Sequence, residues 1–244
     1  MKKIEIDKII QQALKEDHAT EDITSHLLIE RNLVSKAAII IKEQAVICGM
    51  RIAKEVFRKL DKDVQFRAFV HDGQRVAENT PLATLKGKTR ALLAGERVAL
   101  NFLSLLSGIA SKTHSFVLKI RPYKAKIFET RKTLPGLRAL EKYAVRCGGG
   151  LNHRLDLNEM VLIKDNHHNA CPQRPLGDLI RQVKKSTRKI VEVEVDHLKG
   201  FQEALKAKPD IILLDNFGIA QLKKAVTLRE KIKNKKRPQL EASG

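Results

Sequence analysis

The feature that most constrains the fold is a regular alternation of strand and helix patterns along the second half of the chain. Short β-branched or apolar runs predict strands, and the amphipathic runs between them predict helices. Strands joined through helices lie parallel, and unbroken repetition without a reversal favours a barrel over a doubly wound sheet. We therefore expect an α/β barrel with strands at 125–129, 160–163, 189–195, 210–214 and 238–242, and helices near 137–146, 176–185, 198–207 and 219–231.

The first 107 residues follow a different pattern. Apolar residues at helical spacing predict helices near 6–14 and at 51–60, while 91–106 is apolar on more than one face and is expected to pack on two sides. The change of pattern near residue 107 predicts two domains, 1–107 and 108–244. Short alternating runs bounded by turn sequences predict strands in the first domain at 35–42, 45–48, 64–70 and 81–85.

The charge balance narrows the class of partner. The chain has 47 Lys and Arg against 28 Asp and Glu, a net charge of +19 with a pI of about 10.0. Such an excess favours either nucleic acid or a substrate with several phosphates or carboxylates, although part of it is expected to be solvated surface. Two Tyr, eight Phe and no Trp leave few side chains for base stacking, which lowers the expectation of single-stranded binding.

The sequence predicts neither a membrane span nor an export signal. Its longest apolar runs fall far short of the ~18 residues that cross a bilayer. Charged residues within positions 5–8 interrupt any signal-like apolar stretch. Cys48, Cys147 and Cys171 lie far apart without a Cys-x-x-Cys motif, which disfavours a disulfide framework and a structural zinc site. We expect a cytoplasmic protein with reduced thiols.

Charged residues follow the predicted barrel strands, at the strand ends where barrel enzymes place their reacting groups. Four successive strands end in this way, first in cations and then in acids. These ends predict one mouth that binds an anionic substrate, whereas strands that simply run into polar loops are the structural alternative. The ends are Thr130-Arg131-Lys132, Lys164-Asp165-Asn166-His167, Glu194 with Asp196, and Asp215-Asn216.

The predicted strand 191–196 alternates valine with acid. A period of two places Glu192, Glu194 and Asp196 on one face and the valines on the other. Three acids on one face repel one another, so they require cations, a metal ion or water nearby. An edge strand with a wet face is the structural alternative.

Cations between residues 129 and 168 are concentrated rather than periodic. Guanidinium forks and ammonium groups suit carboxylates and phosphates. The run Gly148-Gly149-Gly150 allows close approach of backbone to a ligand, although such a run is more often an ordinary loop. The concentrated cations are Arg131, Lys132, Arg138, His153, Arg154 and Lys164.

Three motifs in this segment resemble the signature of the quinolinate phosphoribosyltransferase family, also called nicotinate-nucleotide pyrophosphorylase (carboxylating). They are TRKTLPGLR (130–138), GGGLNHR (148–154) and IKDNH (163–167). The resemblance extends from residue 14 to the last residue, and so many ordered motifs are specific for the family. Further matches are LKED (14–17), DIT (22–24), ERVALN (96–101), LSGIA (106–110), VEV (193–195), LDN (214–216) and EASG (241–244).

The resemblance implies a type II phosphoribosyltransferase, with an N-terminal α/β sandwich followed by an incomplete α/β barrel. It implies dimers whose active sites are completed by the neighbouring subunit. The implied reaction joins quinolinate to phosphoribosyl pyrophosphate and gives nicotinate mononucleotide, pyrophosphate and CO2, a step of NAD biosynthesis. Both substrates are polyanions, which accounts for the cationic strand ends without nucleic acid or membrane as a partner.

The resemblance also implies roles for single residues. The quinolinate-binding cluster matches Arg131, His153, Arg154 and Lys164, and the arginine delivered from the neighbouring subunit matches Arg97. Positions around phosphoribosyl pyrophosphate match Thr130, Lys132, Ser243 and Gly244. The implied catalytic group is Lys132 with Glu194 and Asp215, and these two acids match those that face the ribose and a magnesium ion.

Several alternatives stay open. A metal site at His167, His168 and Cys171 is weakly supported, because no second ligand pair at zinc spacing accompanies it. The basic run 229–237 fits the solvated end of a barrel helix better than a nucleic-acid patch. A related phosphoribosyltransferase-like family associated with molybdenum transport, and a basic nucleic-acid-binding protein, are the alternative functions.

The last residue falls, by the resemblance, in the loop after the fifth barrel strand. There the family continues with glycine-rich turns that hold the ribose 5-phosphate and with further strands. A sheet that ended at this point would have an unpaired edge, which is a liability. We expect that the native chain continues beyond Gly244 or that this version lacks tight phosphoribosyl pyrophosphate binding, a truncated inactive homologue being the alternative.

Overall fold

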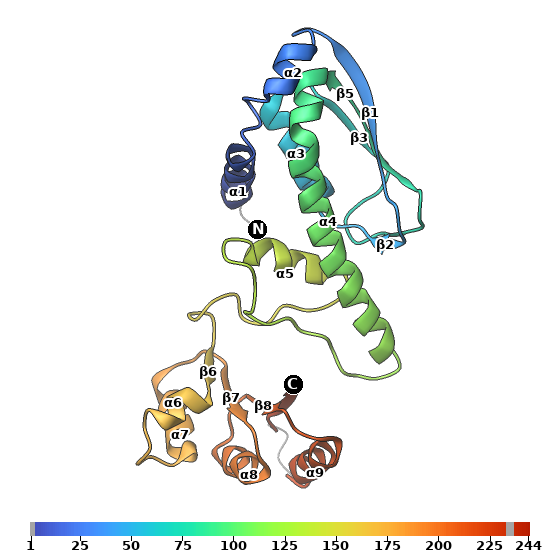
Figure 1. Ribbon diagram of the computed structural model, residues 1–244. Coiled ribbons are helices and arrows are strands. Elements are labelled where there is room, and N and C mark those ends of the chain that lie inside the picture. Colours follow the sequence, from blue (N-terminus) through green and yellow to red (C-terminus); the bar gives the residue numbers. More distant parts are fainter. Residues whose placement is uncertain (1–2, 233–236) are drawn as a thin grey trace. The chain divides into compact units, whose positions relative to one another are not determined.

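The computed structural model describes residues 3–232 and 237–244, so the basic run 229–237 lies partly outside the described residues. Contacts divide the chain into two compact units, Met1–Leu155 (unit 1) and Asp156–Gly244 (unit 2). Figure 1 shows the elements of each unit, coloured along the sequence.

Unit 1 combines helices with a three-stranded antiparallel sheet, in the order β1-β5-β3. These strands are β1 (Val34–Ile40), β5 (Pro81–Lys88) and β3 (Gln65–Ala68), and a short pair is formed by β2 (Ala45–Val46) and β4 (Arg75–Val76). The four strands expected in this part of the chain are confirmed, while β4 and α2 were not predicted. The helices are α1 (Lys3–Glu16), α2 (Ile23–Leu28), α3 (Met50–Leu60), α4 (Thr89–Ile120) and α5 (Arg138–Cys147).

The 32-residue helix α4 is the main core element of unit 1. It packs against α3, α5 and β2, and Leu106 and Ala110 on it are fully buried. It is also the one helix, in the part of the chain that the structure describes, with the length and apolar composition to cross a membrane, which the search for unbroken apolar runs did not foresee. Because its buried residues recur along one stripe and join the core of unit 1, we interpret α4 as a core helix.

Helix α4 also runs without a break through residue 107, where the change of pattern predicted a domain boundary. Leu103 and Ala110, on either side of that point, belong to the same hydrophobic cluster. Since α5 packs on α4 as well, the compact unit extends to Leu155. The limit between the two compact units therefore lies at Leu155 and not at residue 107. The division into domains at 107 stays a prediction.

The strand expected at 125–129 is wrong. This segment makes one parallel bridge, Phe128 with Leu151, and the Leu151 N–H donates to the Ile127 carbonyl at 2.8 Å. The facing residue, Leu151, directly follows the glycine run after α5, and within the described residues the pairing does not extend beyond this bridge. The segment therefore runs as an extended connection from α4 to the residues after Glu129.

Unit 2 is a four-stranded parallel sheet in the order β6-β7-β8-β9. Consecutive strands are neighbours and helices connect them, which confirms the predicted parallel α/β architecture for these four strands. The strands are β6 (Val161–Ile163), β7 (Val191–Val195), β8 (Ile211–Asp215) and β9 (Gln239–Ser243), and the helices are α6 (Asp165–Asn169), α7 (Leu176–Ser186), α8 (Leu198–Ala207) and α9 (Ile219–Glu230).

Strand β7 is an interior strand of this sheet, so the alternative of a wet edge strand is wrong. Val191, Val193 and Val195 pack into the core of unit 2 between the sheet and its helices. On the other face Glu192 is fully buried and Glu194 is half-buried. The predicted alternation of β7 is therefore confirmed. Its acid face is buried near the start of the strand, at Glu192, and partly exposed at Glu194.

The contact between α5 and α4 predicts an effect of a single methyl group. A Cβ on Gly148, which ends α5, would lie 2.3 Å from the Ala110 carbonyl oxygen and 2.7 Å from Thr113 Cβ. Gly148→Ala should therefore destabilise unit 1 by about 1–3 kcal/mol and lower the Tm by about 3–10 °C. Gly108→Ala is the matched control, because a Cβ there meets no atom within 4 Å and alanine favours the helix. Equal melting temperatures for the two variants would contradict this packing.

Candidate active site

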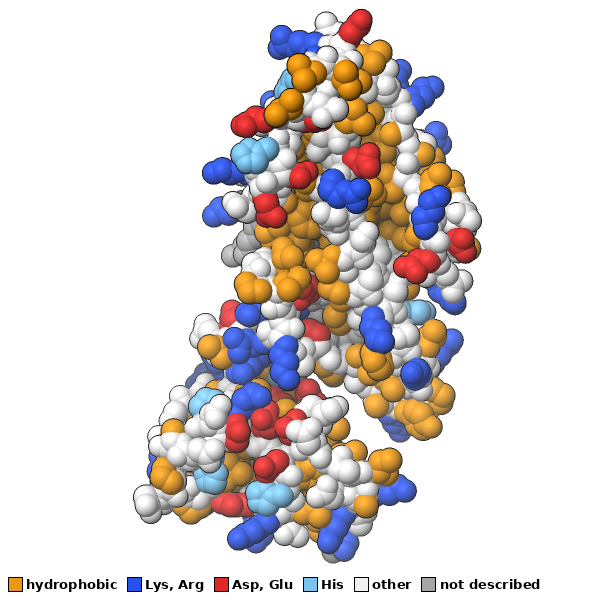
Figure 2. All heavy atoms as spheres, in the orientation of Figure 1, with side chains coloured by type: hydrophobic (Ala, Val, Ile, Leu, Met, Phe, Trp, Pro, Cys, Tyr) orange, Lys and Arg blue, Asp and Glu red, His pale blue; other side chains and the backbone are white. Residues whose placement is uncertain are grey.

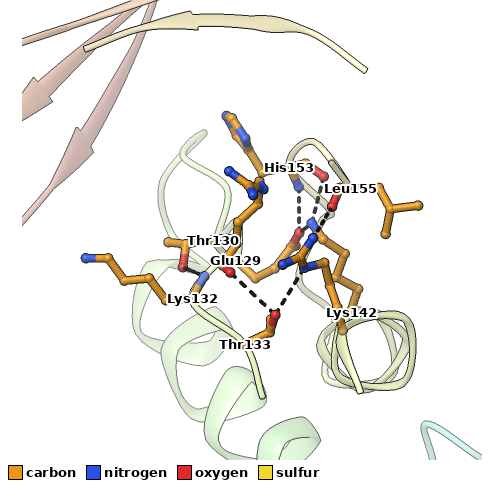
Figure 3. Close-up of polar contacts among 9 residues, drawn as sticks. Glu129, Thr130, Lys132, Thr133, Lys142, His153 and Leu155 are labelled. Atoms are coloured by element: carbon orange, nitrogen blue, oxygen red, sulfur yellow. Dashed lines mark hydrogen bonds and ion pairs between the residues drawn. The ribbon is translucent and has the colours of Figure 1, made fainter. Parts of the chain in front are cut away.

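A buried ion pair between Lys142 and Glu129 organises the predicted site residues of unit 1 (Figure 3). The side chains of Lys142 and Glu129 are only 3% and 10% exposed. The Lys142 ammonium also donates to the His153 carbonyl at 2.9 Å, and Glu129 Oε1 accepts the His153 N–H at 3.0 Å. The pair thus joins two separate segments, the one that begins the TRKT motif and the one that carries His153 and Arg154.

Helix α5 supplies Lys142 and is itself held through the next residue, Tyr143. The Tyr143 hydroxyl donates to Asp72 Oδ2 at 2.9 Å, and Asp72 Oδ1 accepts the N–H groups of Gly49 and Met50. Burial, with the nearby Asp72 charge, raises the pKa of Tyr143, so its hydroxyl stays a proton donor. These bonds fix the helix that places the ammonium of Lys142.

The last turn of α5 brings two thiols together. A hydrogen bond with the Cys147 thiol and burial both raise the pKa of Cys48. The same hydrogen bond lowers the pKa of Cys147, so its thiolate is the favoured member of the pair. Both cysteines are free thiols, and Cys147 stands directly before the glycine run.

The loop after Glu129 is held by short-range hydrogen bonds. The Lys132 N–H donates to Thr130 Oγ1 at 3.0 Å, and the Thr133 N–H donates to the Arg131 carbonyl at 3.0 Å. Arg138 then spans the loop, with Nε donating to Thr133 Oγ1 at 3.1 Å and Nη1 to the Leu155 carbonyl at 3.3 Å. Arg138 was grouped with the anion-binding cations, but here its guanidinium holds the loop.

The other predicted site cations of unit 1 differ in their exposure. Lys132 is exposed, and its side chain points away from the Glu129 pair (Figure 3). Arg131 has a buried Nε without a hydrogen-bond partner in the described part of the chain. Arg154 is buried and His153 is half-buried. Unit 1 therefore brings together four of the predicted site cations, and such a group binds anions.

In unit 2, parallel register aligns the second predicted group. Ile163 on β6 pairs with Val193 on β7, so the residues that follow them lie side by side. These are Lys164 and Glu194, whose Nζ and Oε2 atoms are 2.5 Å apart. The Glu194 side chain is 14% exposed and that of Lys164 is 41% exposed. The pair is thus reachable by a solute from the lysine side.

Register also joins the ends of β8 and β9. Asp215 pairs with Ser243, and the Ser243 hydroxyl donates to Asp215 Oδ1 at 2.6 Å. Asn216 donates its side-chain amide to Asp215 Oδ2 at 2.8 Å and its N–H to the Ser243 carbonyl at 2.8 Å. Gly244 has a φ of 129°, and a Cβ there would lie 2.7 Å from Asn216 Oδ1. The predicted residues Asp215, Ser243 and Gly244 thus form one local cluster.

Carboxylates gather over part of unit 2 (red in Figure 2). Asp196 directly follows β7 and is the third acid of its alternating run. It is exposed, and its carboxylate is hydrogen-bonded to His197 Nδ1 at 2.6 Å. This hydrogen bond lowers the pKa of Asp196. Asp196 and His197 are therefore exposed to solvent, whereas the side chain of Glu194 is largely shielded from it. Hard oxygen ligands suitable for Mg²⁺ are offered by Glu194 and Asp215 on adjacent strands.

Two predicted candidates lie apart from these clusters. Arg97 is exposed on α4 and makes no hydrogen bond or ion pair with another predicted site residue within the described ranges. His167, in the weak metal candidate, accepts the Lys164 N–H through Nδ1 at 3.0 Å, which occupies one of its two possible ligand atoms. Its ring caps the short helix α6 at the end of β6.

The roles of Glu129 and Lys142 are not among the predictions from sequence. Glu129 stands directly before the TRKT motif, so its place next to the cations was a usable signal. Lys142 carried no signal, because it lies in an amphipathic helix with other cations and resembles a solvated lysine. Its burial depends on how α5 is rotated against the rest of unit 1, which local pattern does not specify.

Two family models match the chain. One is described as the N-terminal domain of quinolinate phosphoribosyl transferase and matches residues 22–107, and the other, described as its C-terminal domain, matches residues 109–244. The probable nicotinate-nucleotide pyrophosphorylase [carboxylating] of Synechocystis sp. is 40% identical over 228 residues, which cover 91% of this chain and 75% of that protein. The nicotinate-nucleotide pyrophosphorylase [carboxylating] of Mycobacterium leprae is 42% identical over 227 residues, which cover 91% and 78%.

Solved structures agree with the sequence matches. The nicotinate-nucleotide pyrophosphorylase from Francisella tularensis superposes with a TM-score of 0.92 at 38% identity, over 100% of this chain and 84% of that one. The enzyme of the same name from Pyrococcus furiosus has a TM-score of 0.63 at 15% identity, over 100% and 68%, a likeness of fold alone. The predicted fold class is confirmed.

Because Lys142 and Glu129 form a buried ion pair, the losses of unfolding free energy caused by substituting each of them should not add up in the double variant. Lys142→Met should destabilise the protein by about 3–5 kcal/mol, because it leaves the Glu129 carboxylate buried without its cation. Adding Glu129→Gln removes that charge and keeps an acceptor for the His153 N–H, so the double variant should recover much of the loss. Urea unfolding of the wild type, both single variants and the double variant measures the coupling. Additive losses would show that the pair does not organise the site.

Proposed function

The chain belongs to the quinolinate phosphoribosyl transferase family, and from this premise we propose that it transfers phosphoribosyl from phosphoribosyl pyrophosphate to quinolinate. The reaction releases pyrophosphate and CO2 and gives nicotinate mononucleotide. The observation that carries the proposal is that the residues at the family-motif positions form one cationic group in unit 1 and one carboxylate-rich group in unit 2. A dianionic acceptor and a polyphosphate donor need these two kinds of group.

In this proposal the cations bind and orient quinolinate. Its two carboxylates are bound by Arg131, His153, Arg154 and Lys164, and the uncompensated Nε of Arg131 supports that role. Glu194 holds Lys164 through the 2.5 Å ion pair, so the ammonium is already placed when a substrate carboxylate arrives. Binding then extends an existing ion pair, and little rotamer freedom is lost.

The carboxylates act on the sugar. As the bond from the ribose C1 carbon to pyrophosphate breaks, positive charge grows on the ribose, and Glu194 and Asp215 stabilise it electrostatically. The pyridine nitrogen of quinolinate then forms the new bond to C1. Thr130 and Lys132 bind phosphoribosyl pyrophosphate, and the exposed ammonium of Lys132 meets the leaving phosphates. Ser243 and Gly244 bind the donor next to Asp215.

Decarboxylation follows from the charge of the product ring. The pyridinium nitrogen accepts electron density when the bond from C2 to its carboxylate breaks, so CO2 leaves and C2 takes up a proton. The cations that bound this carboxylate release it as neutral CO2. The proton that C2 takes up comes from solvent water, and no side chain is assigned as its donor.

We also propose Mg²⁺ as cofactor. Glu194 and Asp215 supply the hard oxygen ligands that this ion prefers, and they lie at the ends of adjacent strands. Bound Mg²⁺ would neutralise charge on the pyrophosphate group. A cytoplasmic location is supported by three cysteines that are all free thiols, as in reducing compartments.

Lys164→Ala tests the proposed acceptor site. Loss of a charge-assisted hydrogen bond to a substrate carboxylate should lower kcat/KM for quinolinate by about 10- to 100-fold. Lys199→Ala, at an exposed lysine on α8, is the matched control and should retain wild-type kinetics. Steady-state assays of nicotinate mononucleotide formation measure both variants. Near-normal kinetics of Lys164→Ala would refute the assignment.

A shared active site is tested by mixing inactive variants. We propose a homodimer in which Arg97 of each subunit completes the site of its neighbour. Random dimers of Arg97→Ala and Lys164→Ala chains should then recover about a quarter of wild-type activity, since half are mixed and each of these has one intact site. Lys132→Ala mixed with Lys164→Ala should recover none, because both changes affect the same subunit's site. Equal activity of the two mixtures would contradict the shared site.

A further inference from the structure

The proposed reaction accounts for cations at the strand ends and leaves the end of α4 unexplained. From Arg97 to Phe128 the sequence contains no Asp or Glu, although acids make up 28 of the 244 residues. Five further Lys and Arg fall in this run, all of them after Ala110. With Arg97, this run therefore carries six of the 19 excess positive charges of the chain, and five of the six lie at or beyond the last turns of α4.

In the last turns of α4, two of these cations lie beside one aromatic ring. Lys112, Phe116 and Lys119 stand four and three residues apart, so they share one face of the helix. The ammonium groups of Lys112 and Lys119 lie 5.4 Å and 5.8 Å from the centroid of the Phe116 ring. The face is thus a ring flanked by two positive charges.

The turn after α4 adds a further exposed aromatic residue and further cations. The Arg121 N–H donates to the Leu118 carbonyl and the Tyr123 N–H to the Ile120 carbonyl at 2.8 Å, so the chain keeps close to the helix end. Tyr123 is 71% exposed, and Lys124 beside it is exposed as well. Figure 2 shows hydrophobic side chains (orange) and Lys and Arg (blue) together over this end of α4.

Exposed aromatic side chains are also concentrated here. Of the four exposed Phe and Tyr side chains in the described ranges, Phe116 and Tyr123 lie here, whereas the ring of Phe128 contacts His153 edge-on. The chain as a whole has few aromatic residues, which lowered the expectation of single-stranded nucleic acid as a partner. Because two of the exposed rings, Phe116 and Tyr123, lie among cations, the low total does not decide against such a partner.

Stabilisation of the helix does not explain the whole arrangement. Cations near a helix C-terminus interact favourably with its dipole, which accounts for Lys119 and Arg121. The effect is confined to the last turn, so it does not account for Lys112, and it gives no reason for a tyrosine that is 71% exposed.

We propose that this surface binds single-stranded nucleic acid, with the cations on the phosphates and the aromatic rings against the bases. Proteins that bind single strands without sequence preference combine a positively charged track with aromatic side chains on which bases stack. An anionic membrane fits less well, because interfacial helices insert an apolar face that is separate from their charged face. Here two ammonium groups lie over the apolar ring itself. The proposed surface consists of Lys112, Phe116, Lys119, Arg121, Tyr123 and Lys124.

The test measures fluorescence anisotropy of labelled twelve-nucleotide oligouridine and oligothymidine with the full chain in moderate salt. The variant Lys119→Glu/Lys124→Glu should weaken binding of both oligonucleotides by at least about tenfold, and its salt dependence should be less steep by about 1.4. The control Lys223→Glu/Lys224→Glu makes the same change in net charge at two exposed lysines of α9. It should change affinity less than about twofold, since distant surface charges are screened.

A second variant separates stacking from charge and from folding. Tyr123→Ala alters one exposed side chain and should weaken binding by about fivefold or more, since stacking contributes about 1–3 kcal/mol per base. Phosphoribosyl transfer by the surface variants should stay at the wild-type level, because the surface contains no residue of the proposed active site. Failure of the wild type to bind, or equal losses in the two charge-reversed variants, would overturn the proposal. So would binding to phosphatidylserine vesicles that Lys119→Glu/Lys124→Glu abolishes while oligonucleotide affinity is unchanged.

Discussion

The buried ion pair between Lys142 and Glu129 is the interaction on which the cationic half of the site depends. Two nearly buried charges are tolerated only when each is paired and further hydrogen-bonded. Here the ammonium and the carboxylate both reach the backbone of His153, one through its carbonyl and the other through its N–H. The pair therefore fixes the segment that carries His153 and Arg154 against the loop that carries Arg131 and contributes position rather than net stability.

The carboxylate half depends on a different constraint, the register of a parallel sheet. Ladder pairing aligns the residues that end neighbouring strands, so Lys164 meets Glu194 and Asp215 meets Ser243. These contacts need no special packing once the strands are paired. A parallel sheet with short strands thus gathers polar residues at one end, whereas its valines and isoleucines stay in the core.

These two constraints explain which parts of the structure could be predicted from sequence. Strand and helix periodicity, with the rule that reacting groups lie at strand ends, was sufficient to predict the four parallel strands and the grouping of Lys164 with Glu194. The same reasoning misassigned 125–129 as a strand, because a local pattern does not reveal whether a neighbouring segment pairs along its whole length or only at one bridge. Lys142 was not predictable, since its burial is set by the rotation of α5 on α4, and the continuity of α4 through residue 107 has the same tertiary origin.

The central claim is that the cationic and carboxylate groups perform one reaction, glycosyl transfer coupled to decarboxylation. The most direct measurement supplies the chain with phosphoribosyl pyrophosphate, Mg²⁺ and quinolinate labelled with ¹³C in the carboxylate at C2. The proposed chemistry predicts labelled CO2 and unlabelled nicotinate mononucleotide in equal amounts. A nucleotide that retains both carboxylates, or the absence of any nucleotide, would contradict it.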